Sequence, residues 1–463
     1  MRQRVPLFGP ETKDRSPDVS AVERLNMYLG PNPGGARGDM VLYSMPGTRD
    51  WLSLGGLPVK AWRVVGDYLY AVTGSQIVRV ANDGTTTVRA TLPSSSSTFD
   101  ASDNGEQIIF VAGAAAWIFT IATDVVAAVS GFPGGETVAY QGGRFLSESG
   151  NKIFASDYGA GQTWGGLTFA SAEAYSDNVS RLFVYDNVVI AFGERSVEFW
   201  QNVGTSPFPY APVGTAPQSG LAARWSVAGG SDGVFALLRD ASGRLAVCKI
   251  AQYAVASVTD NRQSAIFEDM TTVSDARGFV FEAAGHEFYQ ITFPTSDQTW
   301  IYDDETGVWS RGVTIDGAQL DGYRAITFGG RRLIASGVNG ALAEVDLDVP
   351  TWAATSTPKG FISRHVSLDY RPAICPSVEL ECEAGTGVSG GGDPQVMMQV
   401  SRDGGHTWGP ERWRGLGAIG NRRQRQVWWR NGTAREWTFK FRVSDAASRV
   451  VIMSALAEFQ VAA

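Results

Sequence analysis

The chain has 463 residues, of which 19% are charged, and its formal net charge is −8. Proteins that coat nucleic acid are usually basic, so this charge argues against a general DNA-coating function. Residues 1–20 lack the apolar core of a signal peptide, and no apolar run reaches the length of a membrane span. We therefore expect synthesis in the cytoplasm of the cell that makes the protein and no membrane segment.

Cysteine and histidine are scarce. Cys248, Cys375 and Cys382 show no paired spacing, and only three histidines accompany them. A Cys/His metal site is not expected from so few ligands, and we predict free thiols and no cofactor. A calcium ion held by an acidic turn stays open, because such a site leaves little trace in a sequence.

The first 38 residues are rich in Pro and Gly. This composition is typical of an extended segment that is ordered by a partner or by a domain surface. We therefore predict an extended N-terminal arm over residues 1–38. Its stretch GPNPGGARG, residues 30–38, lacks the Lys-Ser/Thr pair and the preceding strand of a phosphate-binding loop.

Residues 39–350 repeat one unit, which consists of two alternating strands joined by a Gly- or Asp-containing turn. The units start about 40 to 50 residues apart, which is the length of a four-stranded propeller blade. We predict an all-β fold with a propeller of seven blades, and residues 39–54 could supply a strand that closes the ring. Six or eight blades stay open, because an insertion at 251–277 stretches the fifth unit. The units start at Ala61, Phe99, Val138, Ser180, Trp225, Phe279 and Tyr323.

Residues 361–463 do not continue the repeat and show a different sequence pattern. Six segments of alternating apolar and polar residues occur within about 100 residues, which is enough for a small β-sandwich. The Gly-rich stretch 385–394 has the composition of a flexible loop between two of these strands. We predict a C-terminal β-sandwich-like domain that carries a basic hairpin.

The stretch SRDGGHTW in this domain fits the Asp-box pattern of sialidase propellers. In such a turn the carboxylate accepts backbone N–H groups and Gly allows a positive φ, so the motif stabilises a hairpin and is not itself catalytic. A sialidase needs several boxes together with an arginine triad and a Tyr nucleophile, and here the clean copy lies outside the propeller. We predict a structural turn, although a glycan-binding or hydrolytic role stays open. Its residues are Ser401, Asp403, Gly405, Thr407 and Trp408.

Other candidate catalytic groups are weak. Asp303, Asp304 and Glu305 could serve glycoside hydrolysis, but acidic residues in a turn between strands are usually only solvated. His286 lies among strand residues, where a structural role is the simpler interpretation. No nucleophile elbow, P-loop or zinc-protease motif is present. We therefore predict a protein without enzymatic activity.

The charge is unevenly spread along the chain. Between Arg402 and Arg442 there are ten basic and three acidic residues, a local charge of +7 that leaves −15 for the rest of the chain. The interleaving of Arg and Trp suits docking to an acidic protein face or stacking on nucleic acid, and a solvated hairpin with arginines paired to carboxylates is the third alternative. An acidic body with a basic appendage also favours head-to-tail assembly into a ring. The predicted interaction residues are Arg412, Arg414, Arg422, Arg423, Arg425, Trp428, Trp429 and Arg430.

Three stretches together resemble one protein family. The first is LNMYLGPNPGGARGDMVLYSMPGTRDW, with a turn at Pro46 and Gly47. The second is VVIAFGERSVEFWQNVGTSPFPYAPVGT, in which Glu198 and Trp200 carry the likeness. The third is the Arg/Trp-rich stretch that begins at Ser401, which looks like the end of a phage tail protein. The first two resemble the N-terminal segment and the middle block of the packaged-DNA stabilisation proteins of short-tailed phages, so the resemblance covers nearly the whole chain.

This resemblance implies a non-enzymatic, propeller-containing tail accessory protein, also called a hub or nozzle component. Family members are expected to form a ring, a hexamer, below the portal and its adaptor, where it extends the DNA channel and helps to retain packaged DNA. The ring would receive the tail needle or further tail proteins, and double-stranded DNA would pass through its lumen without sequence-specific binding. The rival interpretations are a tail-associated glycan-binding or sialidase-like propeller protein and a cellular propeller scaffold.

Overall fold

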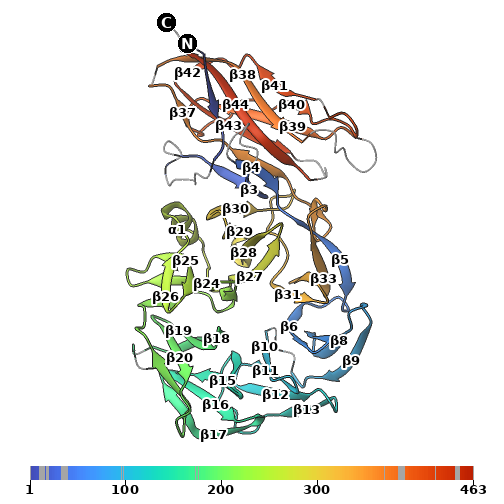
Figure 1. Cartoon of the computed structure of the whole chain (residues 1–463), viewed down its shortest axis with the longest axis vertical. Helices are drawn as coiled ribbons and strands as arrows, with labels where there is room; N and C mark the ends of the chain where they lie inside the picture. The colour runs from blue at the N-terminus through green and yellow to red at the C-terminus, as the bar shows by residue number, and fades with distance from the viewer. Residues whose placement is uncertain are drawn as a thin grey trace.

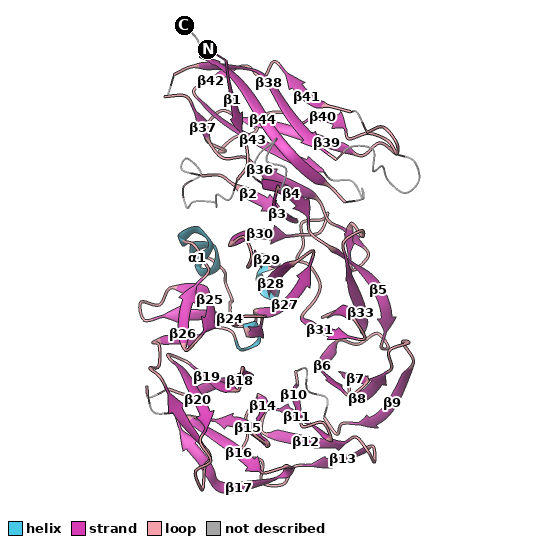
Figure 2. Ribbon diagram, viewed as in Figure 1, coloured by secondary structure: helices cyan, strands magenta, loops and turns pink. Residues whose placement is uncertain are grey.

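A computed structural model of the chain describes residues 2–9, 16, 20–32, 40–94, 96, 98–172, 174–175, 177–369, 371–383, 392–422, 424–443 and 449–461. These residues form strands almost throughout, and Figures 1 and 2 show a ring of small sheets below a separate two-sheet layer. Both chain ends lie at the far side of the upper layer (Figure 1).

Seven antiparallel blades make up the ring in the described part of the chain, each built on four strand positions, and the sixth is continuous with strands beyond the ring. The first four are β6 (Val59–Val65), β7 (Tyr68–Thr73), β8 (Gln76–Val80) and β9 (Thr86–Thr91); β10 (Asp100–Asp103), β11 (Gln107–Ala112), β12 (Ala115–Thr120) and β13 (Val125–Ala128); β14 (Val138–Gln141), β15 (Arg144–Ser149), β16 (Lys152–Asp157) and β17 (Ala160–Ser171); and β18 (Val179–Tyr185), β19 (Val188–Gly193), β20 (Val197–Asn202) and β21 (Tyr210–Val213).

The fifth sheet differs because its first position is shared by two short strands that both pair with β24. It consists of β22 (Ser219–Leu221), β23 (Ala228–Gly229), β24 (Val234–Asp240), β25 (Leu245–Ala251) and β26 (Ala254–Ser257), and η1 (Arg224–Ser226) connects the two short strands. The sixth sheet consists of β27 (Arg277–Ala283), β28 (His286–Phe293), β29 (Gln298–Asp303) and β30 (Val308–Gly312), with η2 (Pro294–Ser296) before β29.

The seventh sheet closes the ring with a strand from far upstream. It consists of β31 (Arg324–Phe328), β32 (Arg331–Ala335), β33 (Ala341–Asp346) and β5 (Gly47–Ser53). The closing strand predicted within residues 39–54 is therefore confirmed, and the seven repeat units correspond to the seven blades.

Local turn chemistry explains why each repeat folds as a hairpin. Asp186 and Asn187, between β18 and β19, both have positive φ, at 46° and 60°. Gly142 and Gly143, between β14 and β15, also have positive φ, at 58° and 83°. Positive φ at both central residues is the signature of the two-residue turns whose twist matches that of paired strands.

Packing between blades makes the ring continuous. Each neighbouring pair of blades shares a buried apolar cluster. The cluster that joins the first and last blades contains Trp62 and Leu69 on one side and Leu333 and Leu342 on the other. Burial of such side chains stabilises the fold by about 1.5–3 kcal/mol each, so ring closure is an apolar contact as well as a backbone pairing.

The second domain is a sandwich of two sheets around a core that contains Trp428, Trp437, Phe439 and Phe459. One sheet has the order β3 (Met27–Pro31), β4 (Met40–Ser44), β44 (Val451–Val461), β38 (Ala373–Cys382) and β41 (Gln426–Trp429), with β1 (Arg2–Pro6) beside β44 and β42 (Thr433–Ala434) beside β38. The other contains β36 (Lys359–Ile362), β43 (Glu436–Val443), β39 (Gln395–Ser401) and β40 (Arg412–Gly415), with β37 (Val366–Ser367) beside β43.

One short strand, β2 (Glu23–Leu25), links the two domains. It pairs with β30 of the sixth blade and with β36 of the sandwich, so a single ten-stranded sheet runs from one domain into the other. The next residue, Asn26, is buried with φ of 50°. Its side-chain amide donates to the carbonyls of Val313, at 2.8 Å, and Pro358, at 2.7 Å, and its side-chain oxygen accepts the Val313 N–H at 3.0 Å.

The described part of residues 1–38 is extended, and the strands of the two domains order it. Residues 2–6, 23–25 and 27–31 form β1, β2 and β3, all of which pair with strands of the body. A sheet edge exposes unpaired N–H and C=O groups, and pairing with these strands satisfies them.

Two small elements complete the fold. The insertion after the fifth blade contains α1 (Asn261–Glu268), which is the one α-helix among the described residues. Its N-cap, Asp260, accepts the Gln263 N–H at 2.7 Å, as N-cap carboxylates commonly do. A two-stranded hairpin of β34 (Thr351–Trp352) and β35 (Thr355–Ser356) lies after the last blade.

Candidate interaction surface

The Asp-box turn lies between β39 and β40, and Gly405 in it approaches Ala21, just before β2. The Asp403 carboxylate accepts the Thr407 N–H at 2.9 Å and both hydroxyls, Ser401 at 2.6 Å and Thr407 at 2.5 Å. Gly405, with φ of 98°, donates its N–H to the Ser401 hydroxyl. These hydrogen bonds hold the pKa of Asp403 well below its usual range. Both carboxylate oxygens are thus engaged within the turn.

The Arg/Trp-rich hairpin places its two tryptophans on opposite faces of β41. Trp428 is fully buried in the sandwich core, and its indole N–H donates to the Arg412 carbonyl at 2.8 Å. Trp429 is 59% exposed. Successive strand residues point to opposite faces, so only one of the pair can reach solvent. The prediction that Trp428 contacts a partner is therefore wrong, and this residue belongs to the core.

Arginine side chains join the two sheets at their edges. β40 ends one sheet and β41 ends the other, and the two strands lie side by side (Figure 2). Arg412 donates to the Trp429 carbonyl at 2.6 Å and to the Asn431 side chain at 2.7 Å. Arg414 donates to the Val427 carbonyl at 3.0 Å. Because a carbonyl is neutral, these bonds position the guanidinium groups without cancelling their charge.

The remaining arginines of this segment have different surroundings. Arg425 pairs with Glu379 at 2.6 Å, so its charge is compensated. Arg422 and Arg430 are exposed, and neither makes an ion pair with a carboxylate in the part of the chain that the structure describes. Arg423 lies outside the described residues. The alternative of arginines paired to neighbouring carboxylates therefore fits Arg425 alone among the described members of this group.

The turn and the basic hairpin border one pocket of about 470 Å³. The two features are separate along the chain and meet in the fold, since Thr407, Arg412 and Arg430 all line this pocket. Lys440 lies over the Trp408 ring, 5.5 Å from its centroid, which adds another cation beside the pocket. The pocket is lined by Val400, Arg402, Thr407, Trp408, Gly409, Pro410, Arg412, Arg430 and Asn431.

Two exposed apolar side chains of the hairpin were not predicted from the sequence. Trp413, on β40, is 42% exposed, and Ile419, in the loop after β40, is 65% exposed. Exposed aromatic and Arg residues together are the usual composition of protein interfaces. The run Arg412-Trp413-Arg414 is the signal that could have identified Trp413, since alternation puts it on the face opposite to its arginine neighbours. We call the exposed members of this region the basic edge: Arg402, Trp413, Arg414, Ile419, Arg422, Trp429 and Arg430.

The acidic turn in the sixth blade is a structural element. Asp303 lies 3.0 Å from His286 Nδ1 and accepts the Thr306 hydroxyl at 2.7 Å. Burial raises the pKa of Asp303, although Thr306 and His286 oppose this. Its neighbour Asp304 binds the Lys249 ammonium at 2.7 Å.

That ammonium also accounts for the one group of carboxylates with metal-like spacing among the described residues, Asp232, Glu287 and Asp304. Lys249 contacts Asp232 at 2.6 Å and Asp304 at 2.7 Å. A protein cation therefore already lies where a metal ion would have to bind.

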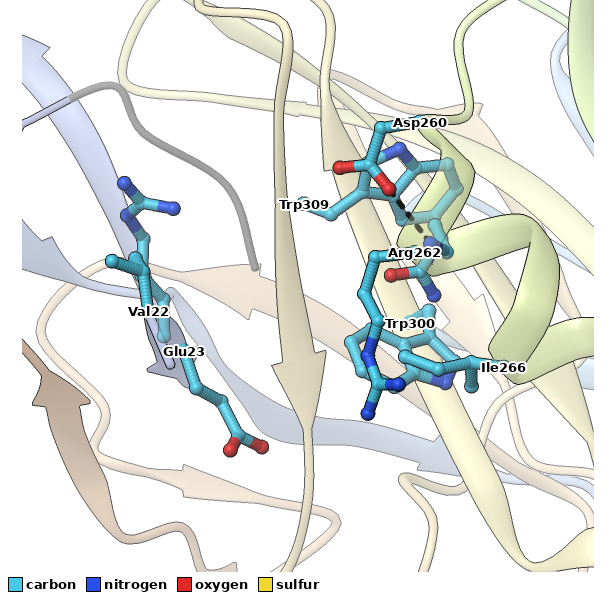
Figure 3. Close-up of a pocket in the computed structure, with 9 residues that line it drawn as sticks. Val22, Glu23, Asp260, Arg262, Ile266, Trp300 and Trp309 are labelled. Atoms are coloured by element: carbon cyan, nitrogen blue, oxygen red, sulfur yellow. Dashed lines mark hydrogen bonds between the residues drawn. The ribbon is translucent and has the colours of Figure 1, made fainter. Parts of the chain in front are cut away.

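A second, narrow pocket separates β2 from the helix of the fifth-blade insertion (Figure 3). Glu23 faces it from one side, and Arg262 and Ile266 of α1 lie on the other, near Trp300 and Trp309. Its volume of about 20 Å³ has room for little more than one water molecule. We interpret it as a gap in the packing between β2 and α1.

Among the described residues, no helix has the length and apolarity that a membrane crossing would require.

Comparison with solved structures finds many chains of low similarity. The designed Ika8 protein is 12% identical, covers 64% of this chain and 99% of its own, and has a TM-score of 0.40. The N-terminal domain of Nup159 is 11% identical over 66% and 95%, with a TM-score of 0.41. The Pan2 WD40 domain of Neurospora crassa is 10% identical over 64% and 96%, with a TM-score of 0.40. The search of curated proteins finds no match.

Two family profiles match the chain, one for each domain. Residues 3–337 match the family described as bacteriophage P22 Gp10, beta-propeller. Residues 360–460 match bacteriophage P22 Gp10, beta-sandwich. The resemblance to tail proteins of short-tailed phages is thereby confirmed, and so is the propeller-plus-sandwich fold. The chain belongs to the bacteriophage P22 Gp10 family of phage tail structural proteins.

Proposed function

We propose that this protein assembles as a hexameric ring, the hub or nozzle of a short phage tail, below the portal and its adaptor. The ring extends the DNA channel, helps to retain packaged DNA, and receives the tail needle or other tail proteins. Its place is the virion tail, after synthesis in the host cytoplasm. The observation that carries this proposal is the basic edge on an otherwise acidic molecule.

The chemistry of the basic edge supports docking to an acidic protein face. Arg412 and Arg414 are held by backbone carbonyls, so their geometry is fixed while their charge stays available. Trp429 adds exposed aromatic area on β41, and Trp413 adds it on the other face of β40. Fixed arginines beside aromatic side chains are frequent among the residues that dominate interface energies. We propose the acidic surface of the next copy or of a neighbouring tail protein as the partner.

The charge outside the hairpin supports passage of DNA without binding. The residues outside Arg402–Arg442 carry a formal charge of −15. A wall of negative charge repels phosphate and keeps a moving duplex from adhering. The lumen of the proposed ring would then conduct DNA without recognising its sequence.

The test is light scattering of the purified protein, alone and mixed with the portal–adaptor complex. We expect a ring on that complex. The double variant Arg422→Glu/Arg430→Glu should lose this assembly by about tenfold or more in apparent affinity, because two attractive contacts become repulsive. The matched control, Arg195→Glu, reverses an exposed arginine on the propeller and should assemble normally.

Two outcomes would count against the proposal. The proposal is wrong if the wild-type protein does not bind the portal–adaptor complex. It is also wrong if the double variant assembles as the wild type does. The glycan-directed alternative has one supporting observation, the pocket beside Trp408. A glycan array together with a sialidase assay tests it, and turnover abolished by a carboxylate substitution would favour it instead.

A further inference from the structure

The centre of the propeller carries a group of arginines that the tail function does not use. They lie on inner strands of different blades, which Figure 1 shows around the middle of the ring. One buried carboxylate, Asp100 on β10, lies among them. The members of this central arginine cluster are Arg63 on β6, Arg181 on β18, Arg277 on β27 and Arg324 on β31.

Aromatic rings hold these guanidinium groups close together. Arg181 and Arg324 both stack on Trp225, at 5.1 Å and 5.4 Å from its ring centroid. Arg277 stacks on Tyr323 at 4.6 Å. Stacking on a ring orients a guanidinium and leaves its N–H edge free to bind an anion.

Few of the N–H donors in the cluster are used. Arg181 donates to the Arg224 carbonyl at 2.9 Å, Arg324 to the Phe99 carbonyl at 3.2 Å, and Arg63 to the Trp62 carbonyl at 3.1 Å. A guanidinium carries five N–H donors, so most donors in the cluster have no protein acceptor among the described residues. Arg181 is only 8% exposed, and its Nε has no hydrogen-bond partner.

The nearby carboxyl groups compensate this charge only in part. Asp100 acts electrostatically on both Arg181 and Arg324, and it also accepts the Val138 N–H at 3.1 Å. Burial raises the pKa of Glu148 to about 8, so this neighbour of Arg181 is largely uncharged at neutral pH. No member of the cluster forms an ion pair with a carboxylate in the described part of the chain.

Burial and mutual repulsion both lower the pKa of arginines in the cluster. They lower the pKa of Arg324 to about 10, with Arg181, Arg277 and Arg63 contributing the repulsion. An anion that lies between neighbouring guanidinium groups reduces their repulsion and so stabilises the cluster.

We propose that the central arginine cluster binds a small multivalent oxyanion of the phosphate class. Guanidinium forks match the oxygens of a phosphate in pairs, which favours this chemistry over a halide. The arginines are at least partly buried between blades, so a compact ion reaches them where an extended duplex does not. This site is independent of ring assembly, because one chain supplies all of its residues.

Calorimetric titration of the full chain with inorganic pyrophosphate, at constant ionic strength, tests the proposal. We expect saturable binding to wild type and a loss of affinity of roughly tenfold or more in Arg277→Gln and in Arg324→Lys. The lysine variant keeps the positive charge but removes the two-pronged guanidinium. A loss of affinity in this variant therefore shows that paired hydrogen bonds to the anion oxygens contribute, and not only charge attraction. Arg195→Gln, at an exposed propeller arginine, should bind as wild type does.

A second readout guards against variants that fail to fold. Pyrophosphate should raise the melting temperature of wild type more than sulfate or succinate does at equal ionic strength. Absence of saturable binding to wild type would overturn the proposal, and so would equal binding by the arginine variants. Binding of a short DNA duplex that the same variants abolish, without pyrophosphate binding, would also overturn it and identify a nucleic-acid surface instead.

Discussion

Glu148 is a carboxyl group buried inside the third blade. It is 3% exposed and accepts the N–H groups of Glu136, at 2.9 Å, and Thr137, at 3.0 Å. Burial raises its pKa to about 8, whereas the pKa of an unfolded glutamate is about 4.3. The folded state therefore holds a proton that the unfolded state releases. Its contribution to stability falls as pH rises through this interval.

We predict that Glu148→Gln flattens the pH dependence of stability. Melting temperatures measured between about pH 5 and pH 9 should fall less steeply for the variant than for wild type. Glu282→Gln, at an exposed position paired with Arg332, is the matched control and should follow wild type. Parallel curves for wild type and Glu148→Gln would show that Glu148 titrates normally in the folded protein.

At the scale of single residues, only some positions could be predicted from the sequence. The Asp-box residues could be predicted because their spacing encodes one local turn, from Ser401 to Thr407. The faces of Trp428 and Trp429 could not, because two adjacent tryptophans satisfy a strand pattern in either register. Glu198 and Trp200, which carried the family resemblance, are both buried, and the Trp200 indole donates to the Glu198 carboxylate at 3.1 Å.

At the scale of elements, the closing strand β5 depends on close packing at its first residue. A Cβ added to Gly47 would lie 2.2 Å from the Thr351 carbonyl oxygen and 2.3 Å from that of Val349. Both are backbone atoms that cannot rotate away. The family-like turn at Pro46 and Gly47 therefore has a physical reason, which is the close approach of two chain segments.

We predict that Gly47→Ala destabilises the seventh blade by about 1–3 kcal/mol, the usual cost of overpacking. Limited proteolysis should then cut near β5 faster than in wild type, and denaturant unfolding should begin earlier. Gly166→Ala is the control, because nothing lies within 4 Å of its added Cβ and its φ is not positive. Equal proteolysis of Gly47→Ala and wild type would show that the strand end adapts at no cost.

The seven blades were predictable because each encodes its own hairpin, as at Asp186 and Asn187. The strand pairings of residues 2–31 were not. Those segments are short and rich in Gly and Pro, and their partners lie hundreds of residues away, for example Arg2 opposite Gln460. Local periodicity carries no information about such pairings.

On the scale of the whole molecule, β2 and Asn26 join propeller and sandwich. The Asn26 side chain bonds residues on both sides of the junction, Val313 after the sixth blade and Pro358 before β36. Asn tolerates the left-handed backbone found at this position better than most residues do.

We predict that Asn26→Ala lowers stability by about 2–4 kcal/mol, because it leaves buried backbone groups unpaired and strains the backbone. Scanning calorimetry should show separate transitions for the two domains, where wild type gives one. Asn26→Gly retains the backbone freedom and removes only the hydrogen bonds, so the difference between the variants measures the strain. A single unshifted transition in both variants would show that the domains are coupled elsewhere.

The return of β5 to β33 has a consequence for biosynthesis. β5 leaves the ribosome early in synthesis, but its partner β33 leaves only after Asp346 has been added. Until then six blades can stack while the ring stays open at both edges, and each open edge is a template for pairing with another polysome-bound chain. The sandwich waits longer still, since β1 and β4 pair with β44, which follows every other described strand. Vectorial synthesis therefore lets neither domain complete its strand pairings until most of the chain has been made, the propeller at Asp346 and the sandwich only with β44.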